Sequence, residues 1–343
     1  MKNFKYMKKI VSLILFFVTF NAFAVNPFVG EYVGKVEAEK GYYKGSPDLS
    51  FVVYKQGDTY TIEAYTLLWR RANSVAQFKV KAEDDVISFA GHAHDNCYLE
   101  GEISDGKITG IATSKISETE SIKTPFTINQ LERKSPTLLQ KAPKDAIILF
   151  DGSKDSAENW NNFTWTINED GSATIAKDDP KHDASISSKQ TFAGDFNMHI
   201  EFMLPDETGA NLGQWRGNSG VFLNRFEFQI LESFGTSGIW NECGAIYKVY
   251  PPLVNASLPP ERWQTFDIEF KAGLVEDGKI VHYPRATMYH NGIRIHTDVE
   301  LNEITAHISS LRTVKPEDIG AIRISLQDHG SKVNFRNIWI QQK

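Results

Sequence analysis

Cysteine is nearly absent from this chain of 343 residues, which contains only Cys97 and Cys243. Two cysteines cannot form the disulfide framework of a small secreted domain, and no CxxC or Cys/His zinc spacing occurs. We expect two free, buried thiols, with a disulfide between two domains as the alternative.

Motifs for nucleotide binding are also missing. The sequence has no P-loop, no Rossmann fingerprint and no Gly-x-Ser-x-Gly elbow. It has no basic stripe, and its formal net charge is -6. These absences argue against a bound nucleotide cofactor and against nucleic acid as a partner.

A long apolar run occurs near the N-terminus, where residues 10–20 follow four lysines and precede Ala22-Phe23-Ala24. This is the pattern of a signal peptide with an A-x-A cleavage site, and the run is too short for a comfortable transmembrane helix. We predict a signal peptide at 1–24, cleavage near Ala24, and a periplasmic or secreted mature chain without membrane insertion. An uncleaved anchor is the alternative. Cleavage removes four lysines and no acids, which moves the net charge to -10.

Long helical periods are lacking in residues 25–135, which instead alternate polar and apolar residues in short segments such as 60–65, 78–81 and 107–111. Hairpin-length turns separate these segments. The pattern predicts an antiparallel all-β accessory domain of seven or eight strands, a small barrel or sandwich. Residues 136–146, with Pro136 and Pro143, form the predicted linker.

Residues 147–343 alternate in the same way, for example over 196–202 and 264–270. Asn291-Gly292 between two such segments is a strong hairpin signal. Strands without long intervening helices predict an antiparallel sandwich. A short helix near residues 302–309 is a further expectation.

The strand at residues 225–232 is the densest in polar side chains. Because alternate residues share a face, Arg225, Glu227 and Gln229 point one way, and the intervening apolar residues point into the core. A bulge would return Glu232 to the Glu227 face, where two acids could serve as proton donor and acceptor. The alternative is a solvated strand face with an Arg225–Glu227 ion pair.

Three other segments carry candidate polar residues. Asn218 lies in a tight polar loop that enters a strand. Gln327-Asp328-His329 follows a strand, and its histidine could act as a base, an acid or a metal ligand. Arg336 could hold a carboxylate of the substrate, of Glu227 or of Asp328. A turn is the alternative role for the Asn218 loop and for the segment Gln327-Asp328-His329. A structural ion pair is the alternative role for Arg336.

His92-Ala93-His94-Asp95 has a spacing of metal-ligating residue types. The pattern has low specificity and lies in a predicted hairpin loop. We therefore assign no metal ion to these residues.

The motifs of the second domain, taken in order, resemble the 3-keto-disaccharide hydrolase domain, formerly a domain of unknown function. The resemblance spans residues 147–341. The matching segments include Ile148-Leu149-Phe150-Asp151-Gly152, Asn218-Ser219-Gly220, Phe226-Glu227-Phe228-Gln229-Ile230-Leu231-Glu232, Cys243-Gly244-Ala245-Ile246-Tyr247, Trp263-Gln264-Thr265-Phe266-Asp267, His290-Asn291-Gly292, Leu326-Gln327-Asp328-His329-Gly330 and Phe335-Arg336-Asn337-Ile338-Trp339.

The resemblance implies a concanavalin-like jelly roll, as in lectins and β-glucanases. Gln229 stands where some glucanases on this fold carry the middle acid, which argues against their double-displacement chemistry. Glu232 stands where this family often has Asp, and Cys243 where Thr is common. The N-terminal domain lies outside the match.

The resemblance further implies action on glycosides that a separate sugar 3-dehydrogenase has oxidised at C3. Glu227 and His329 are then the acid/base candidates, with Asp328 orienting His329 or binding sugar. Arg225 or Arg336 would stabilise an enolate oxygen, and a divalent cation could replace them. Gln229, Asn218, Tyr247 and Gln327 are the candidates for binding the substrate.

Two other functions fit the same residues: a lectin-like module that binds carbohydrate without turnover, and a conventional glycosidase acting on unoxidised glycans. The sugar, the linkage and the oligomeric state are not encoded in any pattern of the sequence.

Overall fold

The computed structural model describes residues 26–45, 48–66, 68, 73–94, 96–175, 184–207, 209, 213–306 and 312–343. The predicted signal peptide lies outside the described residues, and so does Asp95 of the His-x-His-Asp motif. No helix among the described residues is long and apolar enough to cross a bilayer.

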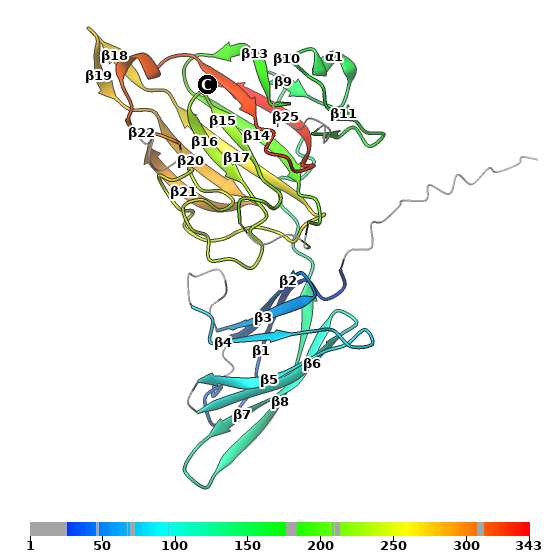
Figure 1. The fold of residues 1–343 in the computed structure, drawn as a ribbon. Helices are drawn as coiled ribbons and strands as arrows, with labels where there is room; N and C mark the ends of the chain where they lie inside the picture. Colours follow the sequence, from blue (N-terminus) through cyan, green and yellow to red (C-terminus); the bar gives the residue numbers. More distant parts are fainter. Residues whose placement is uncertain are drawn as a thin grey trace, which may run out of the picture.

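The N-terminal domain is one antiparallel sheet whose strand order is β4-β3-β2-β1-β8-β7-β6-β5. The two end strands lie close together, so the sheet curls into a nearly closed barrel around its own core. Figure 1 shows it in the lower half of the molecule. The strands are β1 (Gly30–Lys35), β2 (Asp48–Gln56), β3 (Thr59–Tyr65), β4 (Ala76–Val80), β5 (Ile87–His94), β6 (Cys97–Ser104), β7 (Lys107–Lys115) and β8 (Ser121–Leu131).

The C-terminal domain is a sandwich of two antiparallel sheets, which confirms the predicted jelly-roll class. The smaller sheet has the order β10 (Trp160–Asn161), β13 (Ile186–Phe192), β24 (Ile322–Leu326), β15 (Ser219–Leu223), β16 (Phe226–Ile230). The larger has the order β11 (Thr166–Ile167), β12 (Ala173–Thr174), β25 (Asn334–Gln342), β14 (Phe196–Met203), β17 (Trp263–Lys271), β20 (Arg285–His290), β21 (Ile293–Glu300), and β9 (Ile147–Phe150) pairs with β25.

One apolar core fills the space between the two sheets. Val221 and Phe228 of the smaller sheet and Ile200 and Phe266 of the larger sheet are all fully buried in it. Burying such side chains contributes about 1.5–3 kcal/mol each, which is the main force holding the layers together. The outer face of each sheet is therefore where polar side chains gather.

Short elements complete the domain. They are α1 (Lys154–Ala157), the 3-10 turn η2 (Pro316–Asp318), and the paired strands β18 (Leu274–Glu276) with β19 (Lys279–His282) and β22 (Glu303–Ile304) with β23 (Arg312–Thr313). The expected helix near 302–309 is therefore wrong at its start, because Glu303 and Ile304 pair as a strand. Residues 307–309 lie outside the described part.

The predicted Asn291-Gly292 hairpin is confirmed between β20 and β21. The two residues have φ of 51° and 76°, the left-handed conformation that a two-residue hairpin requires. Both cysteines are free and buried, as expected.

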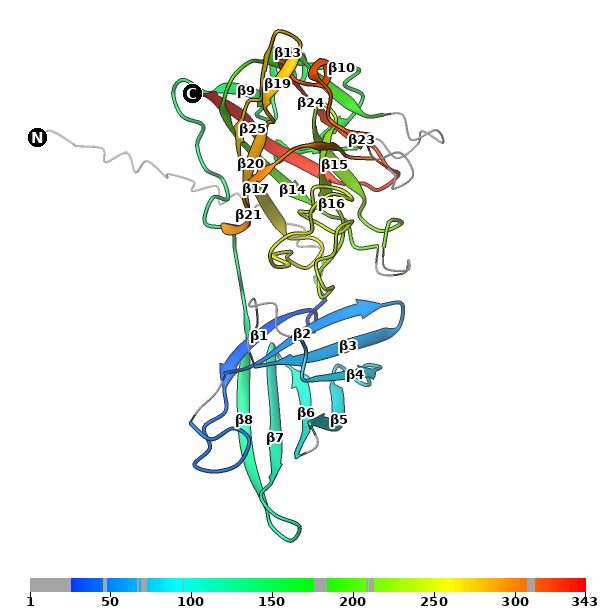
Figure 2. The ribbon, with the colours of Figure 1, turned by 90° about the vertical axis from the view of Figure 1, so that its left-hand side faces the viewer.

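The two domains lie one above the other and are joined along one side (Figure 2). The chain leaves β8 at the barrel, passes beside the sandwich and enters β9. Loops between β16 and β17 extend from the sandwich toward the barrel in both views. Arg133 fixes this junction, because its guanidinium bonds the Glu31 carboxylate at 2.9 Å and the carbonyl oxygens of Ala256 and Ser257 at 3.1 and 2.9 Å.

Candidate active site

The strand β16 has the predicted alternation, but its polar face is not solvated. Phe226, Phe228 and Ile230 lie in the sandwich core. Glu227 and Gln229 point to the outer face, yet they are only 6% and 1% exposed. The segment that follows covers this edge, since Gly244 donates an N–H to the Gln229 carbonyl. The alternative of a solvated strand face is therefore not what the structure shows.

The carboxyl group of Glu227 lies over Gly220 of the neighbouring strand. A Cβ at position 220 would be 2.8 Å from Glu227 Oε1, so glycine lets the carboxyl group take this position without shifting. No described residue makes a hydrogen bond to the carboxyl oxygens, although the backbone N–H of Glu227 donates to Thr305 Oγ1 at 2.8 Å. Burial raises the pKa of Glu227 to about 8. Removal of the carboxyl group from water therefore favours its neutral, protonated form.

Two glutamines flank Gly220 on the adjacent strands. Gln229 is opposite Gly220 in the register, and the Gln327 N–H donates to the Gly220 carbonyl at 3.0 Å. The Oε1 atoms of both glutamines are buried, and neither has a hydrogen-bond partner among the described residues. Such acceptors are costly to leave unpaired, so each of these two amide oxygens lacks a hydrogen-bond donor that it needs.

Asn218 and Tyr247 border the same row. The Gln229 amide donates to Asn218 Oδ1 at 2.9 Å, and the Asn218 amide donates to the Gln214 carbonyl at 2.8 Å. Asn218 therefore positions Gln229. Burial raises the pKa of the Tyr247 phenol, and the nearby Glu227 carboxyl raises it further. The Tyr247 phenol therefore lies close enough to Glu227 for the charges of the two groups to interact.

Arg225 is exposed and lies beside a hollow of about 430 Å³ on the same sheet, which Arg323, Ser325 and Asp318 also line. No ion pair between Arg225 and Glu227 forms. The Arg225 guanidinium is therefore not paired with Glu227. It borders an open space that lies two residues along the chain from the buried acid.

Asp328 and His329 follow β24 in a turn next to the glutamine row. The Asp328 carboxylate accepts the N–H groups of Ala184 at 3.2 Å and of Gly330 at 2.9 Å, so it shapes the turn. Neither of these hydrogen bonds involves the imidazole of His329, so Asp328 does not orient that ring. His329 itself is exposed, two residues beyond Gln327.

Glu232 is placed apart from the Glu227 carboxyl by its own partners. Its Oε2 lies 2.7 Å from Arg216 Nε in a buried ion pair, and its Oε1 accepts the Phe234 N–H at 3.0 Å. The ion pair is close in distance but lacks the angles of a hydrogen bond. Arg216 also donates to the Lys55 carbonyl of the N-terminal domain at 3.2 Å, so this pair ties the two domains together.

Arg336 lies on the other sheet of the sandwich. Its Nε donates to Glu201 Oε2 at 2.8 Å, and its guanidinium stacks on the Trp263 ring at 3.8 Å. The predicted contact of Arg336 with Glu227 or Asp328 is not formed. Arg336 lies on β25 of the larger sheet, whereas Glu227 lies on β16 and Asp328 follows β24 in the smaller sheet. The core separates the two sheets.

Sequence reasoning missed the polar cluster around Glu201. His199 Nδ1 lies 2.6 Å from Asp267 Oδ1, and Glu201 receives hydrogen bonds from Arg336 and Asn337. The signal was present in the alternation of β14, which puts His199 and Glu201 on one face. The linker covers this face, since Leu139 donates its N–H to Glu201.

The His92 ring packs edge-on against Tyr98 at 5.1 Å between centroids. Within the described ranges, no group of three or more His, Cys, Asp or Glu side chains is arranged to hold a metal ion.

Comparison with known proteins gives one family. The family model described as the 3-keto-alpha-glucoside-1,2-lyase-like domain matches residues 145–341. A solved structure of a "putative glycosyl hydrolase" from Parabacteroides distasonis is 35% identical and covers 59% of this chain and 85% of its own, with a TM-score of 0.51. A second structure with the same description and organism is 20% identical and covers 58% and 94%, with a TM-score of 0.39. No curated protein matches the chain.

Proposed function

Since the chain belongs to the 3-keto-alpha-glucoside-1,2-lyase-like family, we propose that it is a carbohydrate-active hydrolase that cleaves 3-keto-glycosides by acid/base chemistry. The observation that carries this proposal is the buried Glu227 carboxyl. It has no partner among the described residues, and its pKa is raised to about 8. A carboxylic acid that holds its proton at neutral pH is what a leaving alkoxide needs.

The chemistry is elimination followed by hydration. A ketone at C3 acidifies the proton on C2, and a base removes that proton to give an enolate. The C1–O bond then breaks as the acid protonates the departing oxygen, which leaves a C1–C2 double bond. Water adds across this bond and regenerates the 3-keto sugar. The route needs a base, an enolate stabiliser and an acid, but no carboxylate nucleophile.

We assign each of these roles to a residue of this chain. Glu227 is the proton donor to the leaving oxygen, and the imidazole of His329 is the base. Arg225 stabilises the enolate oxygen from the adjoining hollow, with a divalent cation as its alternative. The buried amide oxygens of Gln229 and Gln327 accept hydrogen bonds from sugar hydroxyls.

A conventional retaining glycosidase would need a second carboxylate near Glu227 to act as nucleophile. The acids that the sequence suggested are both engaged elsewhere. Glu232 is ion-paired with Arg216, and Asp328 accepts two backbone N–H groups. This arrangement supports the elimination route over double displacement.

The test is incubation of the purified protein with 3-keto-trehalose and a 3-keto-glucoside, each beside its unoxidised parent, with and without added divalent cation. We expect sugar release from the 3-keto compounds and none from the parents. Cleavage of the parents alone would establish a conventional glycosidase. Binding without release across the whole panel would establish a lectin-like module instead.

We also propose that the protein is exported through the N-terminal segment and acts after a separate sugar 3-dehydrogenase. Mass spectrometry of the protein from its native host should give a mature chain that begins near Val25. An intact Met1 in the exported fraction would overturn the proposed cleavage.

A further inference from the structure

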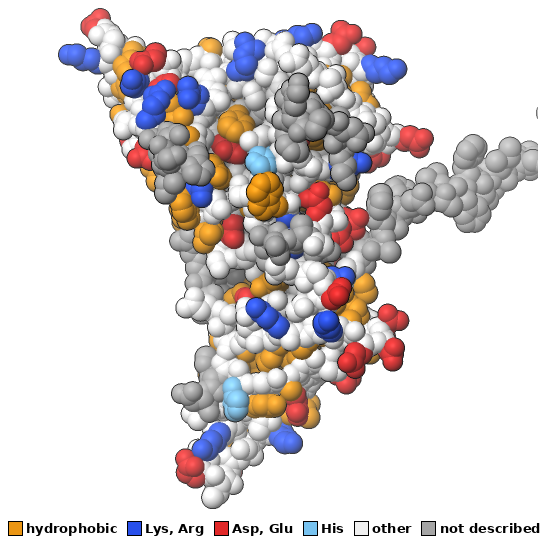
Figure 3. Space-filling view, viewed as in Figure 1, with side chains coloured by type: hydrophobic (Ala, Val, Ile, Leu, Met, Phe, Trp, Pro, Cys, Tyr) orange, Lys and Arg blue, Asp and Glu red, His pale blue; other side chains and the backbone are white. Residues whose placement is uncertain are grey.

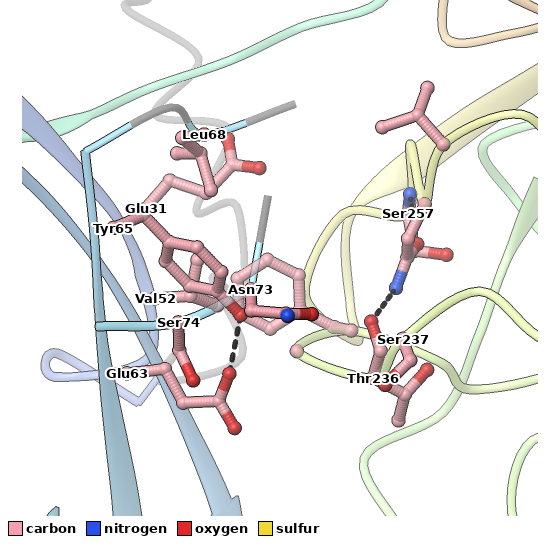
Figure 4. Close-up of a pocket in the computed structure, with 14 residues that line it drawn as sticks. Glu31, Val52, Glu63, Tyr65, Leu68, Asn73, Ser74, Thr236, Ser237 and Ser257 are labelled. Atoms are coloured by element: carbon pink, nitrogen blue, oxygen red, sulfur yellow. Dashed lines mark hydrogen bonds between the residues drawn. The ribbon is translucent and has the colours of Figure 1, made fainter. Parts of the chain in front are cut away.

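A cavity of about 530 Å³ lies between the two domains, away from the Glu227 face. Its size is within the range of about 300–1,000 Å³ that is usual for ligand sites. One wall comes from β1–β3 of the barrel, with Glu63 and Tyr65. The other comes from the loops after β16, with Thr236, Ser237 and Asn255. Figure 4 shows the two sets of side chains facing each other across the gap.

The walls of this interdomain cavity are fixed in advance. Phe234 crosses from the sandwich and is buried in the core of the barrel, at 3% exposure. Gly235 follows with φ of 82°, and a Cβ there would be 2.2 Å from the Tyr54 ring. Asn255 holds this same loop by donating to the carbonyl oxygens of Ser233 and Thr236 at 2.6 and 2.9 Å. The sandwich wall of the site therefore needs little ordering when a ligand binds.

The charges in the interdomain cavity are already compensated. The Glu31 carboxylate is paired with Arg133 at 2.9 Å. Glu63 accepts hydrogen bonds from the hydroxyls of Tyr54 and Tyr65 and from the Gln77 amide. No lysine or arginine is among the described residues that line the cavity. The two carboxylates of the described walls are already satisfied and would repel an anion, so these walls favour an uncharged ligand.

The remaining lining is a mixture of hydroxyl and amide groups with a few apolar surfaces. Asn73, Ser74 and Ser237 offer polar groups, while the half-buried Tyr65 ring offers a flat face. A sugar presents the complementary chemistry, since its hydroxyls donate and accept hydrogen bonds and its C–H face packs on rings. On the face in Figure 3, acidic and basic side chains are interspersed over both domains.

From these observations we propose that the interdomain cavity is a second binding site, for a neutral saccharide unit, to which both domains contribute. The proposal goes beyond the catalytic function and does not depend on turnover. It also gives the N-terminal domain a role, because the barrel provides one wall of the site. The saccharide is either a free disaccharide or part of a longer glycan.

The experiment is isothermal titration calorimetry with trehalose, maltose and maltohexaose, using a Glu227→Gln background so that no substrate is consumed. Ser74→Trp and Ser237→Trp fill the cavity from its two walls. Ser121→Trp, on the β7–β8 hairpin outside the cavity, is the matched control. Thermal unfolding of each variant confirms that it is folded.

We expect saturable binding that is weakened at least tenfold by Ser74→Trp and by Ser237→Trp, and that is retained in Ser121→Trp. Glucuronate and inorganic phosphate should not bind. Tighter binding of maltohexaose than of maltose would identify a glycan chain as the ligand, and equal binding a free sugar. Absence of saccharide binding, or equal binding in the filled and control variants, would overturn the proposal. Neither result depends on whether the protein cleaves 3-keto-glycosides.

Discussion

Two glutamates of the sandwich, Glu227 and Glu201, are buried on the outer faces of opposite sheets, and their acidities move in opposite directions. Burial raises the pKa of Glu227 to about 8, because no described residue bonds its carboxyl group. Burial acts on Glu201 in the same sense, but hydrogen bonds from His199, Asn337 and Arg336 together outweigh it and lower the pKa to about 2.

The comparison separates a chemical role from a structural one. A buried carboxyl that is left without partners is costly to fold, and such a cost persists where the group does chemistry. A buried carboxyl with an arginine and two further donors is a fixed anion, which suits it to hold the linker against the sheet. The partners of each glutamate, rather than its depth, set its role.

The largest effect should come from Glu227→Gln, which keeps the shape and removes the proton. We expect the rate of 3-keto-glycoside cleavage to fall by about 10²–10⁴-fold, the usual contribution of a general acid. Steady-state kinetics should show the loss in kcat, with KM little changed. A variant that loses only affinity would point to a lectin-like role instead.

The next effect concerns the stability of the fold. Glu201→Ala leaves the Arg336 guanidinium, 16% exposed, without its partner. Breaking a buried pair in this way costs about 3–5 kcal/mol of unfolding free energy. Glu276→Ala, at an exposed strand position, is the control and should stay within about 0.5 kcal/mol of the native protein in denaturant unfolding. Equal stability of the two variants would contradict the structural role of Glu201.

The two acids should also respond to pH in opposite ways. Folded Glu227 keeps its proton up to about pH 8, whereas unfolded glutamate loses it near about pH 4.3. The folded state therefore binds more protons between these values, so this group lowers stability as pH rises through that window. Relative to the native protein, Glu227→Gln should become progressively more stable from about pH 5 to about pH 8.

For Glu201 the folded pKa is the lower one, so its contribution is present above about pH 4.3 and is lost as pH falls toward about 2. Denaturant unfolding of the native protein and of Glu201→Gln across pH 2–8 measures this difference. If the free energy of unfolding of Glu227→Gln and of Glu201→Gln, each relative to the native protein, changed with pH in the same direction, the two acids would not differ as described.

The smallest effect tests the support around Arg336. Trp263→Leu removes the ring on which the guanidinium stacks at 3.8 Å. The loss of this cation–π contact should cost about 1 kcal/mol, and catalysis should not change. Trp263→Phe should recover part of the stability because it keeps an aromatic face. A large loss of activity in Trp263→Leu would show that the two sheets are coupled.

Strand positions and the inward faces were predictable, because a period of two marks a half-buried strand without reference to its neighbours. Thus the apolar partners of Glu227 were assigned to the core correctly. Arg336 shows the limit of this approach. Its strand was predicted, but the sheet to which that strand belongs depends on pairing between residues far apart in sequence.

Glu232 shows a second limit. A bulge could have turned it toward Glu227, but the structure pairs it with Arg216 from a loop sixteen residues earlier in the chain. The hydrogen-bond partners of Asp328 were equally hidden, since Ala184 is distant in sequence. Local pattern fixes which way a side chain points, but it does not identify what covers that side chain.

The sequence by itself determined the two antiparallel β regions, the Asn291-Gly292 hairpin and the strand that carries Glu227. These features follow from local periodicity, turn chemistry and composition. The tertiary structure alone decided that Glu227 is buried over Gly220 without a partner, that Glu201 is an ion-paired anion beneath the linker, and that a polar cavity lies between the domains. Burial and charge pairing depend on contacts between distant segments, and those contacts exist only after the chain has folded.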